Sequence, residues 1–247
     1  MSGFKTKWKV FWRIVRECFL RSLTPGLMYF VASVVMLTVY SRGMSLGAQM
    51  AWAVVCAVVA LAYNGLLMWV CGGNHYEMLV SGNMKRRSAM QTGGELNIAS
   101  YKFEKEYRPW KGFAIGGFVA VLGIAGCIAF GCNQEALVEF ARAGEDGELS
   151  RGLAVLSLIF YFLAGWVLLP ILELNATGTA VSFFVGCAIA ALPILVSGGL
   201  YIAGAYGRRN KAIRQQEIAA KAAEEAANKP KKINYGGLPG TKPRKKR

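Results

Sequence analysis

The chain has 247 residues, 54% of them hydrophobic, and its 29 Lys and Arg residues against 14 Asp and Glu residues give a formal charge of +15. Long apolar stretches alternate with polar, charged ones along the sequence. A soluble helix needs one polar face and a soluble strand is short, so this segregation excludes an ordinary soluble domain. It predicts an all-α, polytopic membrane protein with about five apolar helices.

Residues 1–24 are predicted to form a basic amphipathic helix at the membrane surface. In helical projection one face is apolar and carries Trp8, Phe11, Trp12, Val15 and Phe19. The opposite face carries Lys9, Arg13, Glu17 and Arg21. Such a helix lies in the headgroup layer, where each cation contributes about 1 kcal/mol of attraction to anionic lipid. The candidate lipid contacts here are Lys5, Lys7, Lys9, Arg13, Arg16 and Arg21. The alternative is a plain cytoplasmic lead-in that sets topology.

A helical bundle is expected within residues 25–207. Its apolar segments are residues 27–40, 48–70, 112–131, 153–172 and 179–206. Thr24-Pro25-Gly26 resembles a helix start signal, and the short first segment reaches the lower length limit for a span only with its flanks. A cleaved signal peptide is the alternative interpretation of that first segment.

The connecting loops predict the orientation. Residues 74–111 form a polar loop rich in Lys and Arg, expected to hold one short helix, whereas the loop of residues 133–151 is acidic. Lys and Arg next to spans favour the cytoplasmic side. The N-terminus and the basic loop are therefore predicted inside, the acidic loop outside, and the protein in the plasma (inner) membrane.

The C-terminal region has two parts. Residues 208–228 are rich in strong helix formers and are expected to extend the fifth helix into water. Residues 229–247 cannot continue a helix and form a polybasic tail, whose candidate lipid contacts are Lys242, Arg244, Lys245, Lys246 and Arg247. Anionic lipid is the first expected partner and ribosomal or other RNA the second, because phosphate attraction needs charge but little structure. With one aromatic residue in the tail, specific nucleic-acid recognition is not predicted.

The charge of this tail conflicts with five crossings. An odd number of spans from an inside N-terminus places the C-terminus outside, whereas the basic tail belongs inside. One solution is a re-entrant hairpin in the fifth segment, turning at residues 193–199. The other solution, which we favour, is that a different segment does not cross fully. Irregular backbone at membrane depth must be surrounded by protein or a watery cavity, so a hairpin would mark a functional interior.

The sequence offers little catalytic chemistry. His75 is the single histidine, and Glu77, two residues later, falls on another face of a helix. Zinc needs three or four ligands, and a nucleophile needs a base close in space. We therefore expect an interfacial polar cluster at His75, with no catalytic residue, metal ligand or cofactor. The six cysteines are expected to be packing residues rather than a disulfide framework.

Asn64 and Pro193 are the candidate intramembrane polar site. Asn64 is expected to act as an interhelical hydrogen-bonding residue rather than a substrate ligand. Ionisable residues are nearly absent from the apolar segments, which argues against a proton-coupled pump. Asn175 begins a glycosylation acceptor pattern that we attribute to chance.

The leading functional hypothesis is a non-enzymatic component that binds or organises lipid, a protein partner or the ribosome at the cytoplasmic face. A transporter or permease component, with a substrate path near the broken fifth helix and Asn64, is the alternative. A third class, an intramembrane enzyme, would need a catalytic pair visible only in three dimensions. The biological role, the substrate and the oligomeric state do not follow from the sequence.

Overall fold

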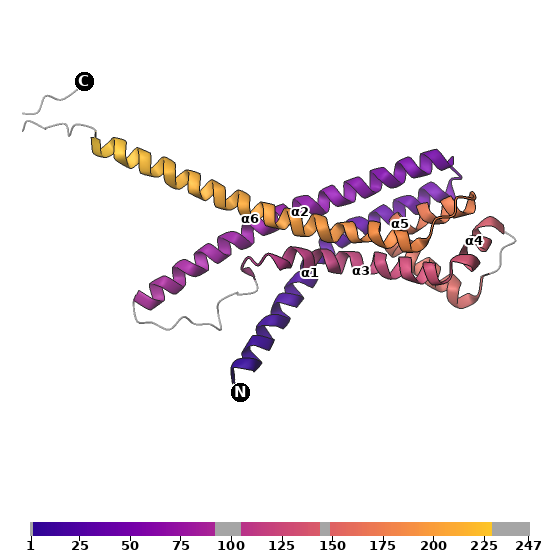
Figure 1. Cartoon of the computed structure of the whole chain (residues 1–247), viewed down its shortest axis with the longest axis horizontal. Coiled ribbons are helices and arrows are strands. Elements are labelled where there is room, and N and C mark those ends of the chain that lie inside the picture. The colour runs from indigo at the N-terminus through magenta and orange to yellow at the C-terminus, as the bar shows by residue number, and fades with distance from the viewer. Residues whose placement is uncertain (1, 92–104, 144–148, 229–247) are drawn as a thin grey trace, which may run out of the picture. The chain divides into compact units, whose positions relative to one another are not determined.

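The computed structural model describes residues 2–91, 105–143 and 149–228, which form six helices and, within those ranges, no strand. The chain divides into two compact units, Met1–Arg208 and Arg209–Arg247. The helices are α1 (Ser2–Ser41), α2 (Leu46–Gln91), α3 (Trp110–Cys132), α4 (Gln134–Ala143), α5 (Arg151–Ala176) and α6 (Phe183–Asn228) (Figure 1). All except α4 are long and apolar enough to cross a membrane. The prediction of an all-α, polytopic membrane protein is confirmed.

The prediction that a helix begins at Thr24-Pro25-Gly26 was wrong. Helix α1 begins at Ser2 and passes through Pro25, whose side chain is buried. Proline removes one helical hydrogen bond, but neighbouring helices can accommodate this loss in membrane proteins. The predicted surface helix of residues 1–24 and the first span are therefore one continuous helix.

The second helix also extends further than predicted. The loop expected from residue 74 onward is helical as far as Gln91, and Gly72 does not end the helix. A Cβ atom on Gly72 would overlap the carbonyl of Tyr201 in α6, and one on Gly204 would overlap the carbonyl of Trp69 in α2. These glycines allow two backbones to approach closely, as small residues do in membrane helix pairs.

The fifth apolar segment is not a hairpin. Helix α6 is continuous from Phe183 to Asn228 and contains Pro193 within it, so the re-entrant turn at residues 193–199 is not formed. Gly116 of α3 lies against the backbone at Pro193, which leaves this part of α6 packed rather than open. The portion of α6 in the second unit, residues 209–228, is helical and exposed.

Contacts within the first unit define the helix directions. Helices α1 and α2 are antiparallel, because Arg21 contacts Cys71 whereas residues 28–35 line a groove with residues 52–60. Helix α6 is parallel to α2, since Asn64 contacts Ser197 and His75 contacts Tyr201. It is antiparallel to α3, since Gly112 meets Tyr201 and Gly131 meets Phe184. Helices α1 and α3 therefore run one way, and α2 and α6 the other.

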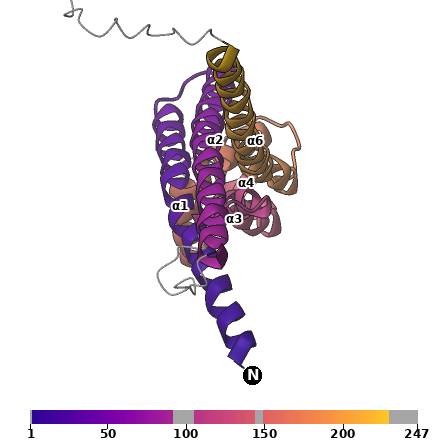
Figure 2. The same ribbon diagram turned by 90° about the vertical axis from the view of Figure 1, so that its left-hand side faces the viewer.

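The first unit has two ends that differ in charge. The basic end comprises residues 8–25, 64–85, 105–118 and 197–208, and the far end comprises residues 26–60, 119–143 and 149–196. Figure 2 views the bundle from the side on which the basic end of α2 lies, with α1 and α2 side by side. Charged and polar residues gather at the basic end, so it contains the candidate site.

Candidate functional site at the basic end

Polar side chains from α1, α2 and α6 meet inside the bundle next to the first half of α1. Glu17 and Arg21 are one turn apart on α1, and Cys71 and His75 are one turn apart on α2, so each pair shares a helix face. Helix α6 adds Tyr201. Ile14, Cys18, Met68, Ile115 and the ring of Tyr201 pack around them as a small apolar core.

His75 is the centre of this polar cluster. Its side chain is 2% exposed, and its Nδ1 lies 2.8 Å from the hydroxyl of Tyr201. Its Nε2 lies 3.7 Å from Oε1 of Glu17, which also accepts a hydrogen bond of 2.7 Å from Nε of Arg21. A chain of four side chains, Arg21–Glu17–His75–Tyr201, thus links α1, α2 and α6. Glu77 points elsewhere and pairs at the surface with Arg208, at 3.2 Å.

The segment before α3 covers the cluster. The backbone N–H of Tyr107 donates to the carbonyl of His75 at 3.0 Å, and the Tyr107 ring stacks on Tyr201 with centroids 5.4 Å apart. Burial raises the pKa of the Tyr107 phenol. The buried Nζ of Lys111 donates to the carbonyl of Glu106 at 2.7 Å. This segment therefore satisfies backbone carbonyls and seals the cluster.

The arrangement does not present Cys71 as an activated nucleophile. Its Sγ lies 4.0 Å from Nδ1 and 3.9 Å from Nε2 of His75, and a sulfur equidistant from both nitrogens lies off the lone-pair direction of each. The thiol is 5% exposed and accepts a hydrogen bond from Nη1 of Arg21 at 3.4 Å. A nucleophile needs alignment with its base and access to substrate. The geometry of Cys71 suits packing instead.

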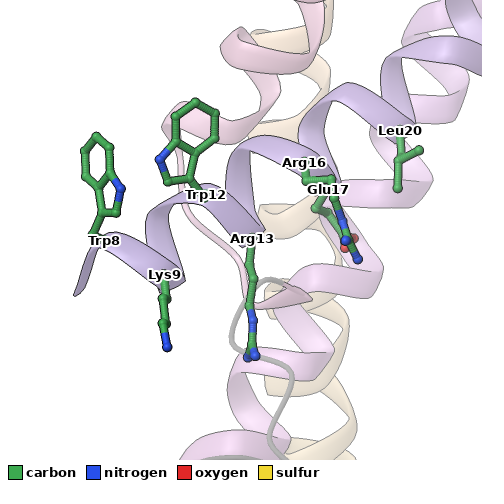
Figure 3. Close-up of a pocket in the computed structure, with 7 residues that line it drawn as sticks. All are labelled: Trp8, Lys9, Trp12, Arg13, Arg16, Glu17 and Leu20. Atoms are coloured by element: carbon green, nitrogen blue, oxygen red, sulfur yellow. The ribbon is translucent and has the colours of Figure 1, made fainter. Parts of the chain in front are cut away.

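The part of α1 next to the cluster has an exposed face. We call residues 8–20, which carry this face, the surface arm. Trp8 and Trp12 are each 53% exposed, and Phe11 is 46% exposed. The arm borders an open hollow of about 600 Å³ whose lining is Trp8, Lys9, Trp12, Arg13, Arg16, Glu17 and Leu20. Figure 3 shows Lys9 and Arg13 on one side of the helix and the two Trp rings on the other. Glu17 borders both the hollow and the buried cluster.

The structure separates the predicted lipid contacts. Lys9, Arg13 and Arg16 are exposed on the surface arm, whereas Arg21 is engaged by Glu17 and Cys71. Contrary to the prediction, Glu17 and Arg21 do not lie on an exposed polar face, because Ile14 and Cys18 on the same side of α1 pack into the bundle. Lys5 and Lys7 lie where side chains are not described, and Lys242, Arg244, Lys245, Lys246 and Arg247 lie outside the described residues.

Asn64 and Pro193 do not form a shared polar site. Asn64 is fully buried and bonds Ser197, with its Nδ2 2.9 Å from Oγ and its Oδ1 3.1 Å from the same hydroxyl. Pro193 is one turn before Ser197 and packs on Gly116. The contact between Asn64 and Ser197 is the interhelical hydrogen bond expected of Asn64. Sequence reasoning missed Ser197, because Ser197-Gly198-Gly199 resembled a break.

Sequence reasoning also missed the partners of His75. The one-turn spacing of Glu17 with Arg21, and of Cys71 with His75, was the available signal. Each pair alone resembles a surface pair, and only the helix packing shows that the two faces meet.

Comparison of the chain with protein families, curated proteins and solved structures finds no match. The class therefore rests on the fold: an all-α, multi-pass membrane protein with five long apolar helices. Its distinguishing feature is a buried polar cluster beneath an aromatic and cationic surface arm.

Proposed function

We propose that the protein is a non-enzymatic, membrane-integral binding component whose surface arm holds anionic lipid headgroups at the cytoplasmic face of the plasma (inner) membrane. The observation that carries this proposal is the joint exposure of aromatic and cationic side chains on residues 8–20. Lipid headgroups offer a partner for both kinds of side chain.

The length of α1 supports a headgroup location for the arm. Its 40 residues correspond to about 60 Å at 1.5 Å per residue, whereas about 20 residues suffice to cross the hydrocarbon. Counted from Ser41, the hydrocarbon portion ends near Arg21, so the arm extends beyond it. Trp69 and Trp110, 46% and 41% exposed, are at the same end of the bundle. Tryptophan is enriched at such membrane interfaces.

The chemistry of the arm fits an anionic surface better than water. The four exposed large aromatic side chains of the arm, Trp8, Phe11, Trp12 and Phe19, are unfavourable in water but suit the headgroup layer. Lys9, Arg13 and Arg16 would each contribute about 1 kcal/mol near anionic lipid. The contacts of Ile14 and Cys18 with the bundle hold the arm in place.

The transport alternative has less support. Its main features were a broken fifth helix and a free polar group at Asn64. Helix α6 is continuous, and Asn64 and Ser197 satisfy each other. A substrate ligand needs polar atoms directed into a path, whereas these atoms face one another between helices.

The test is a titration of the purified full-length protein with phosphatidylglycerol and with phosphatidylcholine, with bound lipid measured by native mass spectrometry. The arm variant is Arg13→Gln/Arg16→Gln. The charge-matched control is Arg42→Gln/Arg151→Gln, which removes two exposed cations at the far end. At about 1 kcal/mol per cation, the arm variant is expected to bind phosphatidylglycerol roughly thirtyfold more weakly, and the control to bind as wild type.

Three results would contradict this proposal: equal loss in the control, no loss in the arm variant, or no preference of wild type for phosphatidylglycerol. Retained lipid binding combined with arm-dependent capture of a protein or ribosome would assign the arm to that partner instead. The loss in the arm variant should also shrink at high salt, because salt screens exposed charges.

A further inference from the structure

We propose that the hollow beside the surface arm recognises anionic phospholipids whose headgroup carries hydroxyl groups, and that Glu17 is the residue that selects them. The proposal rests on the lipid-binding function proposed above and deepens it, because cations alone would hold any anionic headgroup. It is carried by the position of Glu17, a carboxylate in a hollow whose other lining side chains are cationic or apolar.

Glu17 lies where the cations of the arm meet the bundle. Lys9, Arg13 and Glu17 follow one another at intervals of four residues, and Arg16 directly precedes Glu17. Side chains three or four residues apart are neighbours on a helix surface. All four side chains line the hollow, and in Figure 3 they extend from the same side of the helix, away from the two Trp rings. A headgroup whose phosphate is bound by the cations therefore has Glu17 beside it.

The Glu17 carboxylate has acceptor capacity that the cluster does not use. Its Oε1 accepts a hydrogen bond of 2.7 Å from Nε of Arg21 and lies 3.7 Å from Nε2 of His75. Among the side chains that the structure describes, none donates to its second oxygen, Oε2. A carboxylate has room for about four hydrogen bonds. The Glu17 side chain is 14% exposed and lines the hollow, so a donor in the hollow can reach it.

Packing holds this acceptor in place before any lipid binds. Nη1 of Arg21, the partner of Glu17, also donates to Sγ of Cys71 at 3.4 Å, which attaches the pair to α2. Ile14 and Cys18, on the same side of α1, pack into the small apolar core. A group that is already ordered loses less conformational entropy on binding. Glu17 is therefore suited to recognise the headgroup rather than only to attract it.

The charge of the hollow favours a neutral donor over a cationic one. Three cations line it against one carboxylate, and that carboxylate is already paired with Arg21. An ammonium group, as in phosphatidylethanolamine, would meet net positive charge and be repelled. A hydroxyl group donates to the carboxylate without this cost. The headgroup that fits is a phosphate diester with hydroxyl groups, as in phosphatidylglycerol.

The test compares two lipids of equal charge. Phosphatidylglycerol and phosphatidylmethanol share the phosphate diester, but the methyl headgroup has no hydroxyl. Binding of each to the purified full-length protein is measured by native mass spectrometry, with phosphatidylcholine and phosphatidylethanolamine as references. Wild type is expected to bind phosphatidylglycerol about tenfold more tightly than phosphatidylmethanol, because a hydrogen bond to a charged group is lost with the latter.

The variant Glu17→Gln keeps the size of the side chain and removes its charge. A hydrogen bond to a neutral acceptor is about half as strong, so the preference for phosphatidylglycerol should fall to about threefold. The matched control Glu77→Gln changes an exposed carboxylate that pairs with Arg208 and does not line the hollow, so it should keep the full preference. Arg13→Gln/Arg16→Gln should weaken both anionic lipids alike and leave their ratio unchanged.

Equal binding of phosphatidylglycerol and phosphatidylmethanol by wild type, both above phosphatidylcholine, would overturn this proposal and leave the binding of anionic lipid by the arm intact. Equal binding of all the lipids would overturn both. Tightest binding of phosphatidylethanolamine would overturn the choice of a hydroxyl donor. An unchanged preference in Glu17→Gln, with a lower melting temperature, would restrict Glu17 to the buried cluster. If Glu17→Gln does not fold, Glu17→Asp, which shortens the side chain and keeps the charge, replaces it with the same expected loss of preference.

Discussion

The two ends of the bundle are held together by different chemistry. At the basic end, buried and half-buried polar side chains contact one another within α1 and across helices, as in the chain Arg21–Glu17–His75–Tyr201. At the far end the core is apolar and aromatic, with Tyr29, Met36, Phe130, Trp166 and Phe183 among its buried residues. The hydroxyls of Ser33 and Tyr40 there bond backbone atoms of α5 rather than other side chains.

The difference follows from the polar groups that each end contains and from where those groups lie relative to the hydrocarbon. Charged side chains cost much less near the headgroups than in the hydrocarbon, so a cluster that contains Glu17 and Arg21 is best placed where α1 leaves the hydrocarbon. The far end instead surrounds α5, in which Pro170 removes one helical hydrogen bond, and the freed backbone group must find a partner inside the protein. Four experiments can break or sharpen this comparison.

The largest effect is expected where α2 and α6 touch through backbone at the basic end. In Gly204→Ala the new Cβ would overlap the carbonyl of Trp69, and the free energy of unfolding should fall by about 3 kcal/mol, the upper range for overpacking. The control is Gly199→Ala, which meets open space on the same helix and should be neutral or slightly stabilising. Thermal unfolding in detergent, followed by a thiol-reactive dye on the buried cysteines, measures both. Equal melting temperatures would show that this contact is not tight.

The polar cluster is expected to matter next. His75→Leu removes the link between Glu17 and Tyr201, and the loss of these buried partners should cost about 2 kcal/mol. The control Glu77→Gln breaks only the exposed pair with Arg208 and should cost at most about 1 kcal/mol. The same melting assay compares them. A larger loss of stability in Glu77→Gln than in His75→Leu would mean that the surface pair stabilises this end more than the cluster does.

At the far end, Tyr40→Phe tests the support of the α5 backbone next to Pro170. The carbonyl of Leu169 loses its donor, and stability should fall by about 1 kcal/mol. Tyr206→Phe, at a ring that is 55% exposed, should change stability little. Hydrogen exchange of the 165–172 backbone should rise in Tyr40→Phe alone, and unchanged exchange would remove Tyr40 from this role.

The smallest effect is expected at Asn64 and Ser197, at the inner limit of the basic end. A double-mutant cycle with Asn64→Leu and Ser197→Ala should give a coupling of about 0.6 kcal/mol, the average for such bonds in a membrane protein. Additive single effects would show that the two side chains do not stabilise each other. A coupling several times larger would show that this pair stabilises the bundle as much as the cluster around His75.

Local signals in the sequence misplaced helix ends where packing outweighed them. Pro25 and Gly72 resemble breaks, yet both lie inside helices. Pro25 is buried, and Gly72 packs against the backbone of Tyr201 in α6. The buried cluster could not be predicted either. His75 and Tyr201 are separated by 126 positions, and Asn64 and Ser197 by 133, so neither pairing is visible in any local window.

Composition and apolar segment length by themselves determined the class of protein, because hydropathy is a local property and a long apolar helix has few environments other than a membrane. Charge bias further predicted one side of the membrane for the basic residues near both termini. Only the tertiary structure decided how the apolar helices pack, since α5 has a length and hydropathy like those of the other candidate spans. The position of α5 depends on contacts with Phe130, Ser33 and Tyr40, which belong to α3 and α1.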